Sequence, residues 1–222
     1  LAVATRTIRG GTAFGIWPFN RYRRLELSGG VMQYREEFND PTLQDISNNY
    51  QQSTFGRSLF QSGTFVPLSA SYVQETTVFR EFGPLSGNTV RASYEIAPKI
   101  GNTLSRQTTD VDARFYQRIG TSGLLALRAR GFRSWGDSPT FMYFGGNSEL
   151  RGYDYLSFLG SRSAYFNAEL RFPLIEAMLT PLGVLGGIRG VFFANLGGGS
   201  FEGQPGAAGQ YTWFSNKSVQ YA

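Results

Sequence analysis

The sequence contains no cysteine and no histidine in its 222 residues. There is therefore no thiol nucleophile and no imidazole base, and the usual zinc and haem sites are excluded. A disulfide scaffold is excluded for the same reason. The absent histidine also removes the Ser–His pair of common hydrolases, and no pair of carboxylates stands out from the other charges. We therefore expect a protein that is not an enzyme and needs no metal or cofactor.

Charged residues and long apolar runs are also scarce. Charged residues make up 17% of the chain, below the globular norm of roughly 25%. No apolar run reaches the roughly 20 residues of a membrane-spanning helix. The net charge is +5, but its basic residues are scattered, which argues against a nucleic-acid-binding stripe. Glycine (28 residues) and aromatic residues (15%) are abundant instead, as in the tilted strands and aromatic girdles of transmembrane barrels.

The clearest pattern is the period-two alternation of residues 163–172. Its odd positions are polar, as at Asn167 and Glu169, and its even positions are apolar, as at Phe166 and Leu170. Such alternation indicates a strand with one polar and one apolar face. It suits a soluble sandwich with a wet outer face, and it suits a barrel whose apolar face meets lipid.

Seven other segments alternate in a similar way, and no segment is a convincing helix. The expected strands are 6–17, 24–38, 65–79, 89–97, 110–119, 124–132, 163–172 and 188–197. Residues 175–187 are expected to form an apolar connection that holds one helical turn. A Gly-rich loop is expected at 198–209, with another strand from 211 onward.

The links between these strands alternate between short and long. Short turns are expected at 18–22, 80–87 and 120–123, and long loops near 39–62 and 135–161. Short turns on one side and long loops on the other are typical of outer-membrane barrels. Strands of roughly 10 to 15 residues also fit a tilted membrane span better than a soluble sandwich. The sequence therefore predicts an all-β, transmembrane, antiparallel up-and-down β-barrel domain over residues 1–222.

The polar faces of neighbouring strands carry charges of opposite sign. Two aspartates and an arginine on one strand are expected to lie beside two arginines on the next. Opposite charges that face each other across strands contribute roughly 0.2–1 kcal/mol each. We interpret such residues as the lining of a polar lumen. The expected lumen charges are Asp110, Asp112, Arg114, Arg128, Arg130 and Arg171.

Four short motifs occur in the order in which one protein family carries them. A Gly-Gly loop after Phe144 leads into the LRGY sequence at 150–153, and FNAELRFP follows at 166–173. FANLG lies at 193–197, and FGPLSG lies upstream at 82–87. With these motifs the chain resembles the bacterial surface antigen barrels of the BamA/TamA/FhaC-like outer-membrane assembly and secretion superfamily.

The resemblance implies that the loop with Leu150, Arg151, Gly152 and Tyr153 folds back into the barrel lumen. Arg151 would there be held by Glu169 and by residue 195, an aspartate in the usual pattern but Asn195 here. The guanidinium fork would then bind one carboxylate and one amide oxygen. Gly152 is expected to allow a close backbone approach or a positive φ. Tyr153 is expected to pack against the inner wall.

The resemblance also implies that the chain supplies strands six to thirteen of a sixteen-stranded barrel, cut at both ends from a longer protein. An eight-stranded barrel is filled by its own side chains, which leaves no room for an inserted loop. The implied location is the bacterial outer membrane, and the implied function is the insertion or translocation of proteins, or the movement of a lipid. The implied partners are outer-membrane lipid and lipopolysaccharide, client outer-membrane or secreted proteins, and periplasmic or lipoprotein partners.

Three other functions stay open at this point. A passive porin-like channel would use the charged residues as its lining. A small structural barrel or adhesin would have a native mass close to the 24.6 kDa of this chain. An outer-membrane hydrolase has the least support, because the chain has no histidine.

Overall fold

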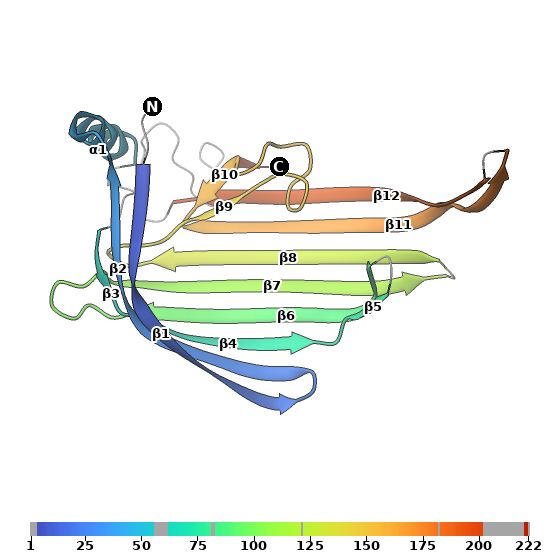
Figure 1. Cartoon of the computed structure of the whole chain (residues 1–222), viewed down its shortest axis with the longest axis horizontal. Helices are drawn as coiled ribbons and strands as arrows, with labels where there is room; N and C mark the ends of the chain where they lie inside the picture. Colours follow the sequence, from blue (N-terminus) through green and yellow to red (C-terminus); the bar gives the residue numbers. More distant parts are fainter. Residues whose placement is uncertain are drawn as a thin grey trace.

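The structure is a computed structural model that describes residues 4–55, 62–80, 83–120, 122–181, 183–201 and 220–221. Its main feature is one large antiparallel sheet (Figure 1). The strands of this sheet are β1 (Ala4–Asn20), β2 (Arg23–Phe38), β3 (Gly63–Phe65), β4 (Leu68–Glu75), β5 (Val78–Arg80), β6 (Gly83–Ala97), β7 (Arg106–Ile119), β8 (Gly123–Trp135), β11 (Arg162–Thr180), β12 (Gly183–Ser200) and β13 (Gln220–Tyr221). The other elements are α1 (Pro41–Phe55) and a separate hairpin of β9 (Met142–Phe144) and β10 (Phe158–Gly160).

The long strands follow one another across the sheet in chain order. The order is β1-β2-β4-β6-β7-β8-β11-β12-β13, with β3 attached to β2 and β5 attached to β6. The predicted all-β, antiparallel architecture is therefore confirmed, and each of the eight expected strands overlaps a strand of this path. The expected strand 65–79 is divided among β3, β4 and β5. Among the described residues, β1 pairs only with β2, and no pairing joins it to β12 or β13, so the sheet is open there.

The register separates the side chains into a polar face and an apolar face. Residues that pair directly lie on the same face, so Asp112 shares a face with Arg130, and Phe166 shares the opposite face with Leu196. Leu196 is 61% exposed and Phe192 is 68% exposed. A large exposed apolar surface marks a surface that contacts lipid or another protein. Other exposed apolar residues on this face are Leu27, Leu68, Tyr94, Val111, Phe115, Phe166 and Leu170.

The connections differ between the two ends of the sheet. Tight turns join β1 to β2, β7 to β8 and β11 to β12 at one end, which we call the turn end (Figure 1). The segment with α1, residues 98–105 and the β9–β10 segment lie at the opposite end, which we call the loop end (Figure 1). The alternation of short and long links therefore corresponds to two distinct ends of the sheet.

The long polar loop expected at 39–62 contains a helix that the sequence did not predict, because Pro41–Phe55 forms α1. The Asp40 side chain accepts a hydrogen bond from the Thr42 N–H at 2.9 Å, and Pro41 occupies the first helical turn. Both are standard helix-start features. Gln44 and Asn48 are hydrogen-bonded one turn apart at 3.0 Å. The apolar residues Leu43, Ile46 and Tyr50 of the helix are spaced as on one helix face, but they are few among polar residues, and Ile46 and Tyr50 are 59% and 64% exposed. Among the described residues, no helix is long and apolar enough to cross a membrane.

Two expected connections are strands instead. Residues 175–187 are not an apolar connection with a helical turn, because β11 and β12 continue through them and pair up to Thr180 and Gly183. The register shifts between Pro173 and Ile175, where proline lacks the N–H needed for a regular ladder. The expected turn at 80–87 is also shorter, since residues 83–87 belong to β6, where Gly83, Pro84 and Ser86 pair with β5. Proline and glycine, which usually signal turns, lie within strands here.

Candidate functional site

The segment between β8 and β11 folds back over the sheet and carries the LRGY sequence (Figure 1). We call residues 136–161 the docked loop. Its hairpin pairs Phe158 with Phe144 and Gly160 with Met142. A Cβ placed on Gly199 of β12 would lie 3.0 Å from the Leu159 carbonyl oxygen, so glycine allows the hairpin to approach the sheet closely. The docked loop therefore rests on β12 rather than extending away from the sheet.

A small apolar core holds the docked loop to the polar face. Its buried members from the loop are Met142, Phe144, Leu150 and Phe158, and Tyr165 comes from β11. The Phe144 ring stacks on Phe158 at 5.2 Å and on Tyr165 at 5.8 Å between centroids. Full burial of one such side chain contributes about 1.5–3 kcal/mol. Hydrophobic packing is therefore the largest contribution to docking, although it occurs on the polar face.

Leu150, the first residue of LRGY, is fully buried, with 0% exposure. A Cβ placed on Gly197 would lie 2.9 Å from Leu150 Cδ1 and 3.0 Å from Tyr165 Cβ. Gly197 is the last residue of FANLG, and its missing side chain makes room for Leu150. Sequence reasoning did not find this contact. The sequence feature that indicates this contact is Gly197, a glycine at a position of the strand that alternation assigns to the polar face.

Arg151 lies in contact with Glu169. Its Nη2 donates to Glu169 Oε1 at 2.5 Å, and the two side chains are 27% and 14% exposed. Arg151 Nε donates to the Asn147 carbonyl at 3.3 Å. Its guanidinium lies 4.7 Å from the Phe193 ring centroid, and Phe193 is the residue directly opposite Glu169 in the register. Arg171 donates to the other Glu169 oxygen at 2.7–2.8 Å, so one carboxylate binds two guanidinium groups.

Asn195 contacts Arg151 through the main chain and not through the guanidinium fork, so the expected arrangement is wrong in this detail. With its amide oxygen turned toward the loop, Asn195 accepts the backbone N–H of Arg151 at 3.0 Å and donates to the Ala194 carbonyl at 3.1 Å. The fork is directed instead toward Glu169 and the Asn147 carbonyl. A neutral amide oxygen is sufficient for a neutral N–H donor. The Asn195 amide therefore holds the main chain of the loop rather than the guanidinium.

The last two residues of LRGY differ from expectation in part. Gly152 has φ +93°, and nothing lies within 4 Å of a Cβ placed on it, so the backbone conformation and not a close approach requires glycine. Tyr153 is 45% exposed and meets Phe158 edge-on at 5.0 Å. Tyr153 therefore packs on the β9–β10 hairpin. Leu150, and not Tyr153, packs against the polar face of the sheet.

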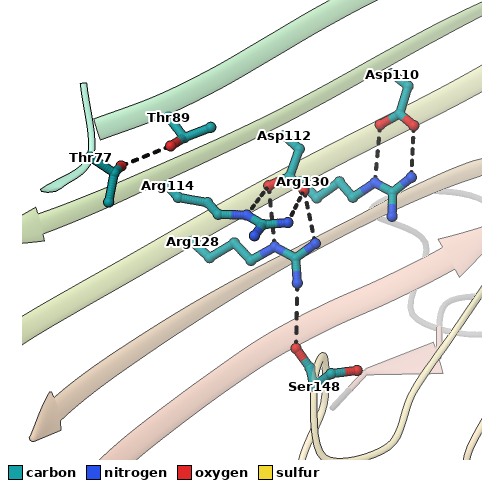
Figure 2. A network of polar contacts seen from close by, with 8 residues as sticks. All are labelled: Thr77, Thr89, Asp110, Asp112, Arg114, Arg128, Arg130 and Ser148. Carbon is teal, nitrogen blue, oxygen red and sulfur yellow. Dashed lines mark hydrogen bonds and ion pairs between the residues drawn. The ribbon is translucent and has the colours of Figure 1, made fainter. Parts of the chain in front are cut away.

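The polar face of β7 and β8 carries two adjacent groups of ion pairs, one around Asp112 and one at Asp110 (Figure 2). Arg130 binds Asp110 through two hydrogen bonds of 3.1 and 2.7 Å, and Arg128 binds Asp112 through two of 3.2 and 2.8 Å. Arg114 binds the same Asp112 at 3.0 Å. Arg114 and Arg128 are direct neighbours in the register, and like charges in that position repel. Asp112 binds both and offsets this repulsion.

The ion pairs of the wall reach the docked loop through Arg128. Its Nη1 donates to the Ser148 carbonyl at 3.4 Å (Figure 2), and its guanidinium lies 5.2 Å from the Tyr165 ring centroid. The six expected lumen charges thus all lie on the polar face, five of them in the β7–β8 groups and Arg171 beside Glu169. Arg128 and Glu169 are two charged residues of the wall that contact the loop. No cluster of three potential metal ligands occurs within the described ranges.

Long antiparallel strands with one apolar face and one charged face are features of the walls of transmembrane β-barrels. In its fold, the chain is similar to a crystal structure of BamA from Haemophilus ducreyi that lacks POTRA domains 1–3. The TM-score is 0.64 and the identity 13%, over 87% of this chain and 42% of the BamA chain. No protein-family model and no curated protein sequence matches this chain. The expected resemblance to BamA-like barrels is therefore confirmed at the level of the fold, and the chain spans less than half the length of that BamA.

Proposed function

We propose that this chain forms part of the wall of a non-enzymatic outer-membrane β-barrel that inserts or translocates proteins, or moves lipids, at the bacterial outer membrane. The observation that carries the proposal is the BamA-like sheet with a loop docked on its polar face. The exposed apolar face supports contact with lipid. Outer-membrane barrels have short turns on the periplasmic side and long loops on the extracellular side. We therefore propose that the loop end faces the outside of the cell and the turn end faces the periplasm.

The proposed whole barrel is larger than the strands described here, with sixteen strands as in the family that the motifs resemble. The docked loop supports this size, because it needs space that the interior of an eight-stranded barrel does not offer. The intact mass of the native protein, measured on gels with and without boiling, tests the size. A heat-shifted species much heavier than 24.6 kDa is expected. A heat-shifted species near 24.6 kDa would contradict the larger barrel.

We propose that the docked loop stabilises the shape of the wall. It contacts β8 through Arg128, β11 through Glu169 and Tyr165, and β12 through Gly197. A loop that joins neighbouring strands resists changes in their curvature. The proposed partners are membrane lipid and lipopolysaccharide, client outer-membrane or secreted proteins, and periplasmic or lipoprotein partners.

The test replaces Arg151 by alanine in the full-length protein and measures the assembly of other outer-membrane proteins in cells. Loss of the Glu169 contact is expected to lower client assembly while the barrel still folds. Tyr155→Ala is the matched control, because Tyr155 belongs to the same loop and is 78% exposed. Wild-type assembly by a normally folded Arg151→Ala protein would refute the proposed role of the docked loop.

The charged polar face supports a second candidate, a passive porin-like channel. Its paired arginines and aspartates form the kind of lining that such a channel uses. The docked loop covers part of this lining, which favours the assembly function. Planar-bilayer recordings distinguish the two, because the channel predicts a large, steady conductance and no change in other outer-membrane proteins on depletion.

A further inference from the structure

The β11–β12 hairpin is longer than the strand beside it. β11 pairs with β8 only as far as Arg171, which lies opposite Leu124, and then continues to Thr180. We call the part of the hairpin at residues 172–190 the ribbon. Among the described residues, this part of β11 pairs with β12 alone. Figure 1 shows the hairpin running past the β7–β8 turn at the turn end, so the ribbon has an open edge on the β8 side of β11.

The order of the strands keeps the rest of an up-and-down barrel away from this open edge. The neighbour of β11 on this side is β8, and further strands of the barrel are added only at the two outer edges of the sheet. β8 begins at Gly123, which pairs with Ile119 to close the turn from β7. The position beside residues 172–180 lies beyond that turn. A strand placed there would continue the β8–β11 pairing, but it must come from another polypeptide segment.

The ribbon carries exposed apolar side chains on both of its faces. Leu179 and Val184 lie directly opposite each other and are 88% and 70% exposed. Met178, on the other face, is 45% exposed, and Leu174 is 61% exposed. Lipid does not account for this surface, because open sheet edges do not occur within the hydrocarbon layer of a membrane. In water, an exposed apolar surface of this kind marks an interaction site.

A hollow of about 390 Å³ lies where the open edge begins. Its lining includes Ser122 and Leu124 beside the β7–β8 turn, Pro173 and Ile175 of β11, and Leu85 of β6. The hollow therefore offers room for a side chain of a strand placed beside β11. Strand edges bind extended segments through main-chain hydrogen bonds, and pockets next to the edge accept alternate side chains. Both features occur together here.

We propose that the ribbon binds an extended polypeptide segment with alternating apolar side chains, which pairs with the open edge of β11 and places one side chain in the hollow. Such alternation is the pattern of a membrane strand. The proposed orientation places the turn end in the periplasm, where the ribbon would receive an unfolded client segment, so this inference rests on the proposed function. Strand pairing is measured on the purified protein and client assembly in cells, so the two proposals can fail separately.

Disulfide trapping in the purified, detergent-solubilised, full-length protein tests this pairing. The 222 residues contain no cysteine, and any cysteine elsewhere in the full-length protein is replaced by serine. The probe is a peptide with the alternating sequence of residues 163–172, in which one cysteine is placed at each position in turn. With Ala177→Cys in the protein, we expect disulfides at alternate peptide positions only, because successive side chains of a strand point to opposite faces. Equal yields at consecutive peptide positions overturn the proposal.

The matched control is Gly186→Cys, because Gly186 lies directly opposite Ala177 on β12 and both positions are exposed. A peptide strand beside β11 lies two strand spacings from β12, about 9–10 Å, and a disulfide needs Cα atoms within about 7 Å of each other. We therefore expect trapping at Gly186→Cys to be at least tenfold lower than at Ala177→Cys. Equal trapping at the two positions overturns the proposal, since the peptide would then not lie at the open edge of β11.

A shortened ribbon and a rearranged peptide separate strand pairing from general apolar adhesion. Replacing residues 175–187 by Asn-Gly, a tight hairpin turn, removes most of the open edge, and heat-modifiable migration shows whether the barrel folds. Fluorescence anisotropy of the labelled peptide is expected to show at least tenfold weaker binding to the shortened protein. The same residues, rearranged so that polar and apolar residues no longer alternate, are expected to bind the wild type at least tenfold more weakly. Equal binding in either comparison overturns the proposal, and the cysteine variants, which keep the whole ribbon, decide it if the shortened protein does not fold.

Discussion

Replacing Glu169 by glutamine is expected to loosen the docked loop. The Glu169 carboxylate accepts the Arg151 guanidinium at 2.5 Å in a mostly buried position, at 14% exposure. A hydrogen bond to a charged group contributes about 1.5–3 kcal/mol. Glutamine keeps the shape and one oxygen but removes the charge, so we expect a loss of about 1.5 kcal/mol or more in the docking free energy. That loss raises the population of the undocked loop roughly tenfold or more, since about 1.4 kcal/mol corresponds to a factor of ten.

Limited trypsin proteolysis measures this change directly, because the bond after Arg151 becomes accessible when the loop undocks. When opening and closing are fast, the cleavage rate follows the population of the open form. Glu95→Gln is the matched control, because Glu95 also pairs with an arginine, Arg106 at 3.1 Å, and does not contact the loop. We expect roughly tenfold faster cleavage after Arg151 in Glu169→Gln and wild-type cleavage in the control. A rate within about twofold of the wild type, in a folded protein, would refute the role of this ion pair.

Two further predictions concern the apolar contacts. Leu150→Ala is expected to lower the docking free energy of the loop by about 2–5 kcal/mol, the usual range for a fully buried leucine. Hydrogen exchange of the β9–β10 amides measures the loss, and equal protection in Leu150→Ala and the exposed Tyr155→Ala would contradict it. On the apolar face, Leu170→Arg at the middle of β11 is expected to lower the free energy of unfolding in bilayers by about 2–4 kcal/mol. Leu179→Arg near the turn end, at 88% exposure, is expected to cost about 0–1 kcal/mol, because the cost of a charge falls with distance from the bilayer centre. Equal costs in urea titrations would mean that the apolar face is not embedded in lipid.

The docked loop shows why the polar face also needs apolar residues. Its polar contacts fix the position of the loop, since Arg151 binds Glu169 and the Ser148 carbonyl accepts a hydrogen bond from Arg128. The buried side chains of Phe144 and Leu150 supply most of the docking energy. The proposed function depends on both kinds of contact. Variants of the ion pairs test the position of the loop, and variants of the core test its attachment.

The sequence by itself determined the architecture of the sheet and the face of each charge. Side chains of a strand alternate strictly between its two faces, so period two was enough to locate the long strands. The same rule assigned Asp112, Arg128 and Glu169 to the polar face. It also brought Arg151 close to Glu169 once the resemblance placed the loop inside. These features follow from local backbone geometry, which depends only on residues close together in the sequence.

Only the tertiary structure decided the features that depend on contacts between distant residues. Helix α1 has only a short apolar row at Leu43, Ile46 and Tyr50, so its start signals at Asp40 and Pro41 stood among mostly polar residues. The Asn195 amide accepts the Arg151 backbone N–H because the loop's path presents that group. Gly197 makes room for Leu150, although the two positions lie 47 residues apart in the sequence. Such contacts depend on how the loop folds back across the sheet, and alternation along a strand carries no information about that path.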